Sequence, residues 1–271
     1  MQEEISLPDL RDLAKEIVCD KYSNKGWDKT LVYVPAELEL AIYVNRQALV
    51  TILCTPSKLN CLVIGYLYAE GIISGISDIA SMRVCNEESL VDVMLNNPKY
   101  ELPTVRTIAS GCGGSGIFKT QGQNVNSGLV VTPMEVLSLM KQFQKQMVLY
   151  RFTGGVHTSA LSDTKNLLVV AEDIGRHNAL NKIHGECLLR ELSTRERLLL
   201  TTGRISSEML LKAAKMQVPV VVSRHSPTGR AISLARDLGI ALVGEARGSR
   251  LSVFSHQERL GLSTEAQTRV K

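Results

Sequence analysis

The sequence predicts an α/β protein in which a mixed β-sheet with flanking helices follows a smaller N-terminal α+β domain. From residue 152 onward, short apolar segments of strand length alternate with stretches long enough for helices. That alternation is typical of a sheet with some parallel strands. The preceding part instead combines two strand pairs with one helix. A chain of 271 residues can bury a large core in one domain or in two.

Residues 1–30 are predicted to form a leader ahead of the folded domains. They contain an acidic amphipathic stretch and the polar run CDKYSNKGWDKT, without the basic-then-apolar layout of a signal peptide. No apolar run approaches the roughly 20 residues of a membrane span. The six cysteines lack CxxC spacing, which is usual for free thiols in a reducing compartment. We therefore expect a cytoplasmic protein with no membrane partner.

The smaller domain is predicted to contain two hairpins and one helix. In LVYVPAELELAIYVNRQALVTILC, Asn45 and Arg46 separate two apolar runs, which indicates a hairpin turn. Thr55 and Pro56 have the residue types of a helix N-cap and of the first helical position. Apolar residues then recur at helical spacing as far as Gly71. The segment MRVCNEESLVDVML predicts a second strand pair.

The segment NNPKYELP marks a boundary between the small domain, residues 31–104, and a larger one, residues 105–271. A long helix is expected early in the larger domain, because Thr132 and Glu135 form a capping-box pattern around Pro133. The expected buried stripe of this helix consists of Val136, Met140, Phe143 and Met147.

The strands of the larger domain are predicted from five short apolar segments. These are LLVVA (167–171), LLLTT (198–202), VPVVVS (218–223), IALV (240–243) and LSVF (251–254). Polar residues follow four of them, in EDIGRHN, GRISSEM, SRHSPTG and GEARGSR. Ligands of open α/β sheets bind outside the carboxyl ends of the strands. We therefore expect the functional site at that edge of the sheet.

The first polar cluster has two interpretations that the sequence leaves open. Glu172, Asp173, Arg176, His177 and Asn178 crowd one strand-to-helix junction. One interpretation is helix capping, with Asp173 as the N-cap. The other is a ligand site, because five functional side chains within seven positions at a strand end are typical of one.

The next two clusters favour an anionic ligand. TTGRISSEML combines a strand, a glycine and hydroxyls at a helix start, where free N–H groups and Arg204 would suit a phosphate. SRHSPTGR repeats the pattern, with Ser226 as the expected N-cap and Pro227 opening the helix. Three such junctions in one sheet point to an anionic or nucleotide-like ligand. The net charge of +4 suits such a ligand and is too small to predict nucleic-acid binding.

His157, in FTGGVHTSALSD, could belong to a zinc site or to the structural core. A zinc deaminase would carry Glu two residues after the histidine and a later PCxxC. Ser159 occupies that position and no PCxxC exists, so a deaminase-like hydrolase is disfavoured and no metal is expected. A lone histidine is more often a hydrogen-bonded structural residue than a ligand.

Cys112 stands in GCGGSG, residues 111–116, among four glycines. A structural cysteine is normally surrounded by larger apolar side chains. Glycines let another molecule approach the sulfur closely and let several N–H groups face a thiolate, which would lower its pKa. One alternative is a glycine-rich turn in which the cysteine is incidental. The chemistry that fits best is a thiol that attacks, holds a group and releases it to a visiting acceptor.

Several segments together resemble the FdhD family of formate dehydrogenase accessory sulfurtransferases. They are RTIASGCGGSG, FTGGVHTSAL, AEDIGRHNALNKIHG, TTGRISSEMLLKAA, YLYAEGII and the C-terminal stretch that begins PVVVSRHSPTGR. The resemblance runs from about residue 35 to the C-terminus. It implies that the larger domain has a cytidine-deaminase-like fold without zinc chemistry.

The resemblance also implies a sulfur relay. A cysteine desulfurase would load sulfur onto a cysteine as a persulfide. That sulfur would pass to the molybdenum (or tungsten) bis(molybdopterin guanine dinucleotide) cofactor, which then enters the catalytic subunit of formate dehydrogenase. The cofactor would be a bound substrate, and the protein would hold no metal tightly itself. A homodimer is also expected, since folds of this kind often dimerise.

Residue by residue, the family's persulfide cysteine falls on Cys112. Its cofactor-binding segment falls on Glu245, Ala246, Arg247, Gly248, Ser249 and Arg250. The anion-binding turns add Gly203, Arg204, Ser206, Arg224 and His225 as expected ligands of the guanine dinucleotide.

The chain departs from the family at one loop position. Many members carry CxxC there, whereas this chain has Ser115 in place of the second cysteine. This argues against a scheme that moves sulfur between two loop cysteines, and a one-cysteine relay remains chemically sufficient. The alternative function is a non-catalytic chaperone that binds the molybdenum cofactor and delivers it.

Overall fold

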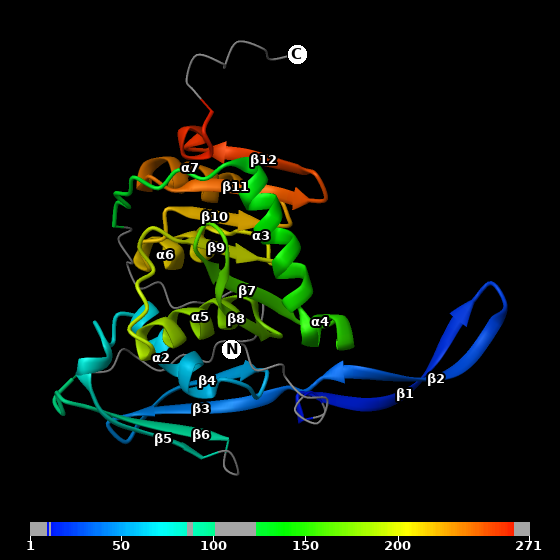
Figure 1. Ribbon diagram of the computed structural model, residues 1–271. Helices are drawn as coiled ribbons and strands as arrows, with labels where there is room; N and C mark the ends of the chain where they lie inside the picture. The colour runs from blue at the N-terminus through cyan, green and yellow to red at the C-terminus, as the bar shows by residue number, and fades with distance from the viewer. Residues whose placement is uncertain (1–9, 11, 86–88, 101–122, 263–271) are drawn as a thin grey trace.

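The computed structural model describes residues 10, 12–85, 89–100 and 123–262. They form a six-stranded sheet flanked by helices, a four-stranded sheet, and a two-stranded ribbon that projects from the body (Figure 1). The mixed α/β class with a smaller N-terminal α+β domain is therefore confirmed. The finer cytidine-deaminase-like assignment stays a prediction. No helix in these ranges is long and apolar enough to cross a bilayer.

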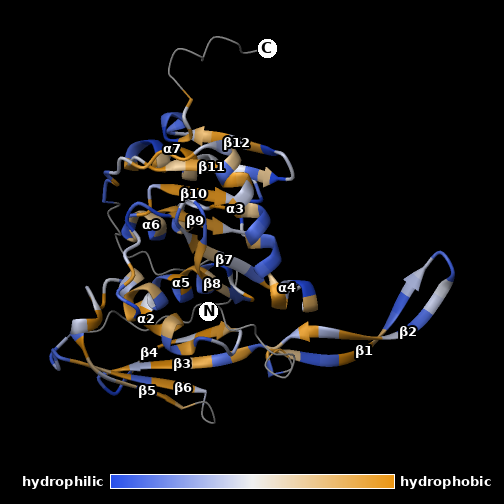
Figure 2. Ribbon diagram, in the orientation of Figure 1, coloured by the Kyte–Doolittle hydropathy of each residue, from blue (hydrophilic) through white to orange (hydrophobic). Residues whose placement is uncertain are grey.

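The projecting ribbon consists of β1 (Ala14–Ser23) and β2 (Gly26–Pro35), paired antiparallel. The sequence-based interpretation of residues 1–30 as a leader missed both strands, and the expected boundary at residue 30 falls inside β2. The signal was weak because large apolar side chains on the ribbon stay exposed, among them Tyr22 and Trp27, whose rings lie 5.2 Å apart. Figure 2 shows hydrophobic and hydrophilic segments interspersed along the ribbon.

The small domain has the strand order β4-β3-β6-β5. Its elements are β3 (Leu38–Val44), β4 (Gln47–Cys54), α2 (Leu59–Ala69), the short helix η1 (Ile76–Asp78), β5 (Ile79–Cys85) and β6 (Leu90–Leu95). Asn45 and Arg46 both have positive φ, 50° and 64°, which confirms the predicted hairpin turn. Strands β3 and β6 are parallel, and the other two pairs are antiparallel.

The larger domain has the strand order β12-β11-β10-β9-β7-β8. Its strands are β7 (His157–Ser162), β8 (Leu167–Asp173), β9 (Leu198–Thr201), β10 (Val220–Ser223), β11 (Ala241–Arg247) and β12 (Arg250–Ser255). The central trio β9, β10 and β11 is parallel, whereas β7 and β12 run antiparallel to their neighbours. All five strands predicted from apolar runs are therefore confirmed, and β7 completes the sheet.

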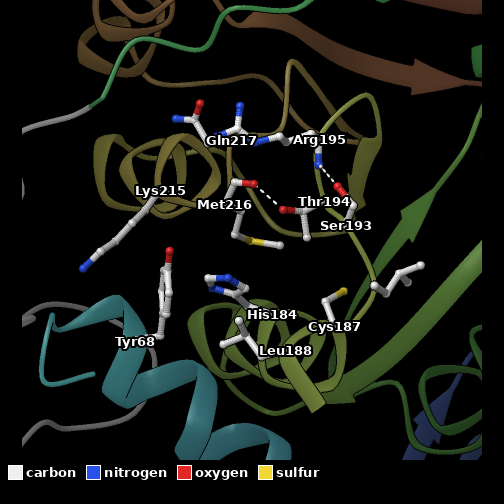
Figure 3. Close-up of a pocket in the computed structure, with 11 residues that line it drawn as sticks. Tyr68, His184, Cys187, Leu188, Ser193, Thr194, Arg195, Lys215, Met216 and Gln217 are labelled. Atoms are coloured by element: carbon white, nitrogen blue, oxygen red, sulfur yellow. Dashed lines mark hydrogen bonds between the residues drawn. The ribbon is translucent and has the colours of Figure 1, made fainter. Parts of the chain in front are cut away.

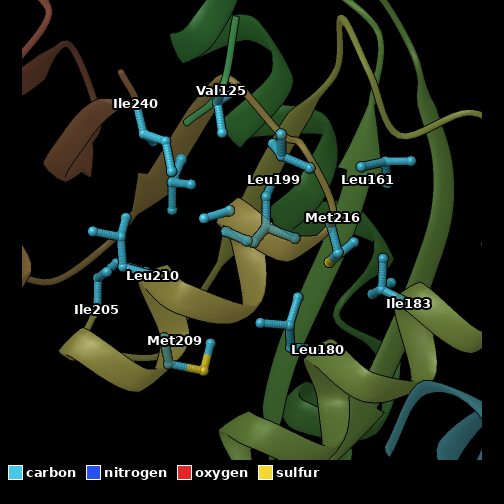
Figure 4. Packing of buried hydrophobic residues seen from close by; sticks show 14 of the residues in the cluster. Val125, Leu161, Leu180, Ile183, Leu199, Ile205, Met209, Leu210, Met216 and Ile240 are labelled. Atoms are coloured by element: carbon cyan, nitrogen blue, oxygen red, sulfur yellow. The ribbon is translucent and has the colours of Figure 1, made fainter. Parts of the chain in front are cut away.

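Helices cover both faces of this sheet. They are α3 (Pro133–Gln146), α4 (Val148–Thr153), α5 (Arg176–Leu189), α6 (Ser207–Lys215), α7 (Gly229–Leu238) and the short helix η2 (Gln257–Leu260). The buried side of α3 packs on one face, and all four residues of its predicted stripe are buried. Figure 4 shows the other face, where Leu180 and Ile183 of α5 and Met209 and Leu210 of α6 pack with Leu199 of β9.

The capping box of α3 is confirmed. The Thr132 side chain accepts a hydrogen bond from the Glu135 N–H at 3.2 Å, and the Glu135 carboxylate accepts one from the Thr132 N–H at 2.7 Å. Local signals suffice here, because every group in the motif lies within one turn of chain.

Three other predicted helix starts are wrong. Helix α2 begins at Leu59, not at Pro56, and α7 begins after Thr228, not after Ser226. Asp173 is not the N-cap of α5, because Gly175 occupies that position. In each case the expected capping residue contacts a distant segment: Thr55 and Asp173 bind each other, and the Ser226 hydroxyl donates to Glu245.

The two domains meet where α2 crosses α5. Each helix presents a glycine to the other: a Cβ on Gly65 would lie 1.9 Å from the carbonyl oxygen of Asn181, and one on Gly185 would lie 1.9 Å from that of Cys61. The two backbones are thus in direct contact. Beside this crossing, the buried Lys182 ammonium lies 2.7 Å from the Asp173 carboxylate and donates to the Thr55 carbonyl oxygen at 3.0 Å. These contacts fix the small domain against the sheet edge that carries the polar junctions.

Candidate functional site

The carboxyl ends of four strands meet at one edge of the six-stranded sheet. Strands β8, β9, β10 and β11 share one direction, because β7 is antiparallel to both of its neighbours. Strand β7 therefore begins at this edge, with His157 paired to Asp173. The cationic edge, as we call it, consists of His157, Arg176, His177, Arg204, Arg224, His225 and Arg247.

Arg247 and His225 form the best-defined contact of the cationic edge. The Arg247 Nε donates to the Arg224 carbonyl oxygen at 2.7 Å, and its guanidinium lies 3.0 Å from the His225 Nδ1. Since arginine can only donate, Nδ1 accepts and the His225 proton resides on Nε2. Partial loss of hydration, followed by the charges of Arg247, Arg224 and Arg204, lowers the pKa of His225 below its usual value. The ring is therefore neutral at pH 7, among three guanidinium groups.

The segment expected to bind the cofactor, residues 245–250, spans the end of β11 and the turn into β12. Arg247, Gly248, Ser249 and Arg250 are exposed around this turn, and Gly248 has φ of 60° with open space around it. The Ala246 side chain lies in the core, so this residue can offer a ligand only its backbone.

Glu245 is engaged by its neighbours. Its carboxylate accepts hydrogen bonds from the hydroxyls of Ser226 at 2.7 Å and Ser252 at 2.8 Å. These bonds, the one from Ser226 first, lower the pKa of Glu245 and keep it ionised. We conclude that Glu245 ties the loop after β10 to the β11–β12 hairpin. If Glu245 also binds a ligand, it does so in addition to this structural role.

The turn after β9 differs from the expected anion-binding turn. The Gly203 N–H donates to the Thr201 hydroxyl at 3.0 Å, and the Gly203 carbonyl oxygen accepts from the Ser223 hydroxyl at 2.8 Å. The Gly203 N–H is therefore already engaged within the turn. Because a Cβ on Gly203 would lie 3.0 Å from the Cβ of Arg176, the glycine lets these two segments approach closely.

The hydroxyl of Ser206 caps α6, accepting a hydrogen bond from the Met209 N–H. The His225 N–H donates to the Ser223 hydroxyl at 2.9 Å. With these internal hydrogen bonds in place, attraction for an anion comes mainly from the side chains of Arg204, Arg224 and Arg247. Arg204 and Arg247 are exposed and Arg224 is half-buried.

In the EDIGRHN cluster, some residues have structural roles and others belong to the candidate ligand site. Glu172 accepts hydrogen bonds from the N–H groups of Leu149 and Tyr150 at the start of α4, and burial raises its pKa. Asp173 is fully buried and accepts from the Gly175 N–H and the Asn178 amide. These acidic and amide side chains therefore have structural roles, although Asp173 is not the N-cap of α5 as the capping interpretation expected. Arg176 and His177 remain as members of the cationic edge.

His157 and His177 are neutral imidazoles. Burial, then the charges of Arg176 and His225, lowers the pKa of His157. Burial and the Lys212 charge lower the pKa of His177 to about 3, and its Nε2 lies 3.4 Å from the Glu208 carboxylate. The sequence analysis did not predict that His157 lies close enough to His225 for their charges to interact. An antiparallel strand starting at His157 would have placed this residue at the carboxyl ends of β8 and β9, and the apolar run after His157 was the available signal for that strand. Within the described ranges, no three His, Cys, Asp or Glu side chains form a group that could hold a metal ion.

Cys112 and Ser115 lie outside the described residues, so the geometry of the expected sulfur-carrier loop is not on view. The described cysteines are free thiols, of which Cys54, Cys61 and Cys187 are buried. Burial raises the pKa of Cys54 and of Cys187 to about 12, which leaves these thiols protonated and poorly nucleophilic.

The fold and the cationic edge define an α/β protein with arginine and histidine side chains grouped at the carboxyl ends of its central strands. The sequence model of the FdhD/NarQ family matches residues 35–261, and this chain belongs to that family. The chain is 38% identical over 244 residues to the Sulfur carrier protein FdhD of Staphylococcus aureus strain Newman, covering 87% of this chain and 92% of that protein. The protein of the same name from strain MRSA252 gives the same values.

A solved structure has the same fold. It is the crystal structure of a proposed formate dehydrogenase accessory protein from Desulfotalea psychrophila, with a TM-score of 0.78 and 26% sequence identity. The similarity covers 92% of this chain and 99% of that one. The fold likeness therefore extends over both domains.

Proposed function

We propose that this protein is a sulfur carrier in the maturation of formate dehydrogenase. Cys112 would receive sulfur as a persulfide from a cysteine desulfurase. The sulfur would then pass to the molybdenum (or tungsten) bis(molybdopterin guanine dinucleotide) cofactor held at the cationic edge. The family membership and the names of the relatives support the sulfur-carrier role. The cofactor-binding part of the proposal rests on one observation: Arg204, Arg224, His225 and Arg247 are grouped at one edge of the sheet.

The sulfur relay is chemically balanced with a single thiol. The Cys112 thiolate attacks the outer sulfur of the desulfurase persulfide, forming Cys112–S–SH, while the desulfurase cysteine leaves as a thiolate. Delivery as sulfide breaks the S–S bond and needs two electrons, supplied by two thiols that are oxidised to a disulfide or by another two-electron reductant, and Cys112 returns to the thiol. Ser115 takes no part in either step.

The cationic edge suits the ligand's charge pattern. A bis(guanine dinucleotide) cofactor carries two diphosphates, and guanidinium groups bind phosphate oxygens by charge-assisted hydrogen bonds. The neutral His225 can donate from Nε2 to a further phosphate oxygen. Arg204 and Arg224 side chains make no hydrogen bond to another described residue, so their donors are available to a ligand.

Loading of Cys112 is the first expected outcome. Incubation with a cysteine desulfurase and cysteine should add one sulfur atom to the intact protein, and reductant should remove it. Cys112→Ser should show no gain, whereas Cys19→Ser, a control at a half-buried cysteine, should load normally. Equal loading of Cys112→Ser and wild type would contradict the proposal, as would no loading with an active desulfurase.

Diphosphate binding is the second expected outcome. We expect Arg204→Gln to weaken binding of GDP-mannose by roughly tenfold, because it removes one charge-assisted contact. The matched control is Arg83→Gln, an exposed arginine of β5 in the four-stranded sheet. Isothermal titration calorimetry gives both affinities. Equal loss in the two variants, or no loss in either, would remove the cationic edge from the proposal.

The same ligand tests the pH dependence. Its diphosphate is a diester, so no phosphate titrates near pH 6. In the free protein partial loss of hydration, followed by the charges of the neighbouring arginines, keeps the pKa of His225 below its usual value of 6.5. A bound diphosphate favours the imidazolium and raises that pKa, so binding takes up a proton. Affinity should therefore rise as the pH falls from 7 to 5.5, and His225→Gln should abolish the rise.

The second candidate function is a chaperone that binds and delivers the cofactor without carrying sulfur. The assembled cationic edge favours it, since this site does not depend on Cys112. The two functions separate in cells. If Cys112→Ala keeps formate dehydrogenase active while Arg247→Gln abolishes activity, the protein is a chaperone. Loss in both variants, with folding retained, supports the sulfur carrier. A homodimer and direct binding of the formate dehydrogenase catalytic subunit also remain proposals.

A further inference from the structure

A pocket lies between the two domains, at the edge of the sheet opposite the cationic edge. It has a volume of about 210 Å³ and is walled by the end of α2, the middle of α5, the loop before β9 and the end of α6 (Figure 3). The last two segments precede β9 and β10 in the chain, so they lie at the amino ends of these parallel strands. The pocket is therefore separate from the proposed cofactor site.

His184 is a buried polar side chain at this pocket. It is only 6% exposed and lines this pocket. Its ring packs edge-on against Tyr68 with the centroids 4.4 Å apart, and neither ring nitrogen forms a hydrogen bond with any residue in the described ranges. Burial, then the charges of Lys215 and Lys212, lowers the pKa of His184 to about 3. The neutral ring thus presents one donor and one acceptor, and buried polar groups are rarely left unpaired.

The charged groups at the pocket are cations. The Lys215 Nζ donates to the Ala69 carbonyl oxygen at 3.1 Å and lies 5.4 Å from the centre of the Tyr68 ring. No carboxylate of the described chain comes within 4.0 Å of it; burial lowers the pKa of Lys215, and the charge of Glu70 opposes this shift in part. Arg195 adds a second cation at the rim, and none of the described residues that line the pocket is acidic. This arrangement favours a negatively charged group.

The remaining wall is mixed. Its apolar part consists of the Tyr68 ring, Cys187, Leu188, Leu192 and Met216, and Ser193, Thr194 and Gln217 add polar groups. Figure 3 shows the Met216 thioether, the His184 ring and the Cys187 thiol facing the same space. At about 30 Å³ for a water-sized group in a liquid, this volume has room for on the order of seven such groups. A ligand would therefore be small, with an apolar part that fits against Leu188, Leu192 and Met216.

We propose that this pocket binds a small organic carboxylate, with its charged end at Lys215 and the His184 imidazole and its compact apolar body against Leu188, Leu192 and Met216. Such a ligand would contact Tyr68 of the small domain and α5 and α6 of the larger one at once. Its binding would thus stabilise the packing of the two domains against each other. The inference is independent of the sulfur-carrier proposal, because it uses neither Cys112 nor the cationic edge.

Benzoate is the probe, and benzyl alcohol is its neutral counterpart of nearly the same shape. The full chain labelled with ¹⁵N-histidine gives side-chain signals for only five histidines, so the His184 signal can be assigned with His184→Gln. We expect benzoate to shift the His184 signal saturably, and benzyl alcohol to bind about tenfold more weakly because it lacks the charge.

Two variants test the geometry. Lys215→Met should weaken benzoate binding about tenfold, whereas Lys141→Met, an exposed lysine on α3, should leave it unchanged. Ser193→Trp places a large ring at the rim and should abolish binding while the protein stays folded. Equal binding of benzoate and benzyl alcohol, full binding by Lys215→Met, or no saturable shift in the wild type would each overturn the proposal.

Discussion

Replacing Gly65 or Gly185 by alanine is expected to destabilise the protein by on the order of 3–5 kcal/mol. The added Cβ would lie 1.9 Å from a backbone carbonyl oxygen of the facing helix in either case. A side chain could rotate away from such a clash, but a backbone carbonyl in the middle of a helix cannot. Helices α2 and α5 would have to separate, which opens the junction between the small and large domains.

Gly229→Ala is the matched control. Gly229 is also a helical glycine, at the start of α7, and a Cβ there would meet nothing within 4 Å. Alanine should be neutral there or stabilising by up to about 1 kcal/mol, since it lowers the entropy of the unfolded chain. Urea unfolding of the three variants gives the comparison. If Gly65→Ala and Gly185→Ala unfold at the same urea concentration as Gly229→Ala, the two backbones are not in contact in solution.

Lys182→Met is expected to have the second large effect, a loss of about 3–5 kcal/mol. Lys182 and Asp173 are both fully buried with 2.7 Å between Nζ and Oδ2. Removing the cation leaves a buried carboxylate whose remaining partners are neutral donors. The Lys182 ammonium also donates to the Thr55 carbonyl oxygen and the Ser57 hydroxyl, so the same change removes contacts to the small domain.

Lys58→Met supplies the comparison for this prediction. Lys58 pairs with Glu186 at 2.5 Å, but its side chain is 39% exposed, so its loss should cost less than about 1 kcal/mol. A double variant, Asp173→Asn with Lys182→Met, should cost less than the sum of its two single changes, because the charges act as a pair. Strict additivity in urea unfolding would show that the pair is not coupled.

The cationic edge was predictable to the extent that it follows from strand direction. Arg204, Arg224 and Arg247 each come just after or at the end of an apolar strand, and the carboxyl ends of parallel strands meet at one edge. That the turn after β9 would leave its Gly203 N–H engaged was not predictable. The Gly203 N–H is taken by the Thr201 hydroxyl, a contact that depends on the conformation of the turn.

The helix starts also differ in how far the sequence predicts them. The capping box of Thr132 and Glu135 forms as the sequence predicts, because its groups are neighbours in the chain and face solvent. Thr55 and Ser226 have the same residue chemistry, but their side chains or backbones bind groups on other elements. Those competing partners are 119 and 19 residues away, so no local pattern reveals them.

The sequence by itself determined the α/β class, five strands of the six-stranded sheet, the family and the polar residues at the strand ends, because period, turn chemistry and motif are local properties. The tertiary structure alone decided which of those residues meet. It brought His157 to His225, buried Asp173 against Lys182, and formed the His184 pocket between α2, α5 and α6. The physical reason is that such contacts depend on how closely elements pack, and at α2 and α5 that closeness rests on Gly65 and Gly185.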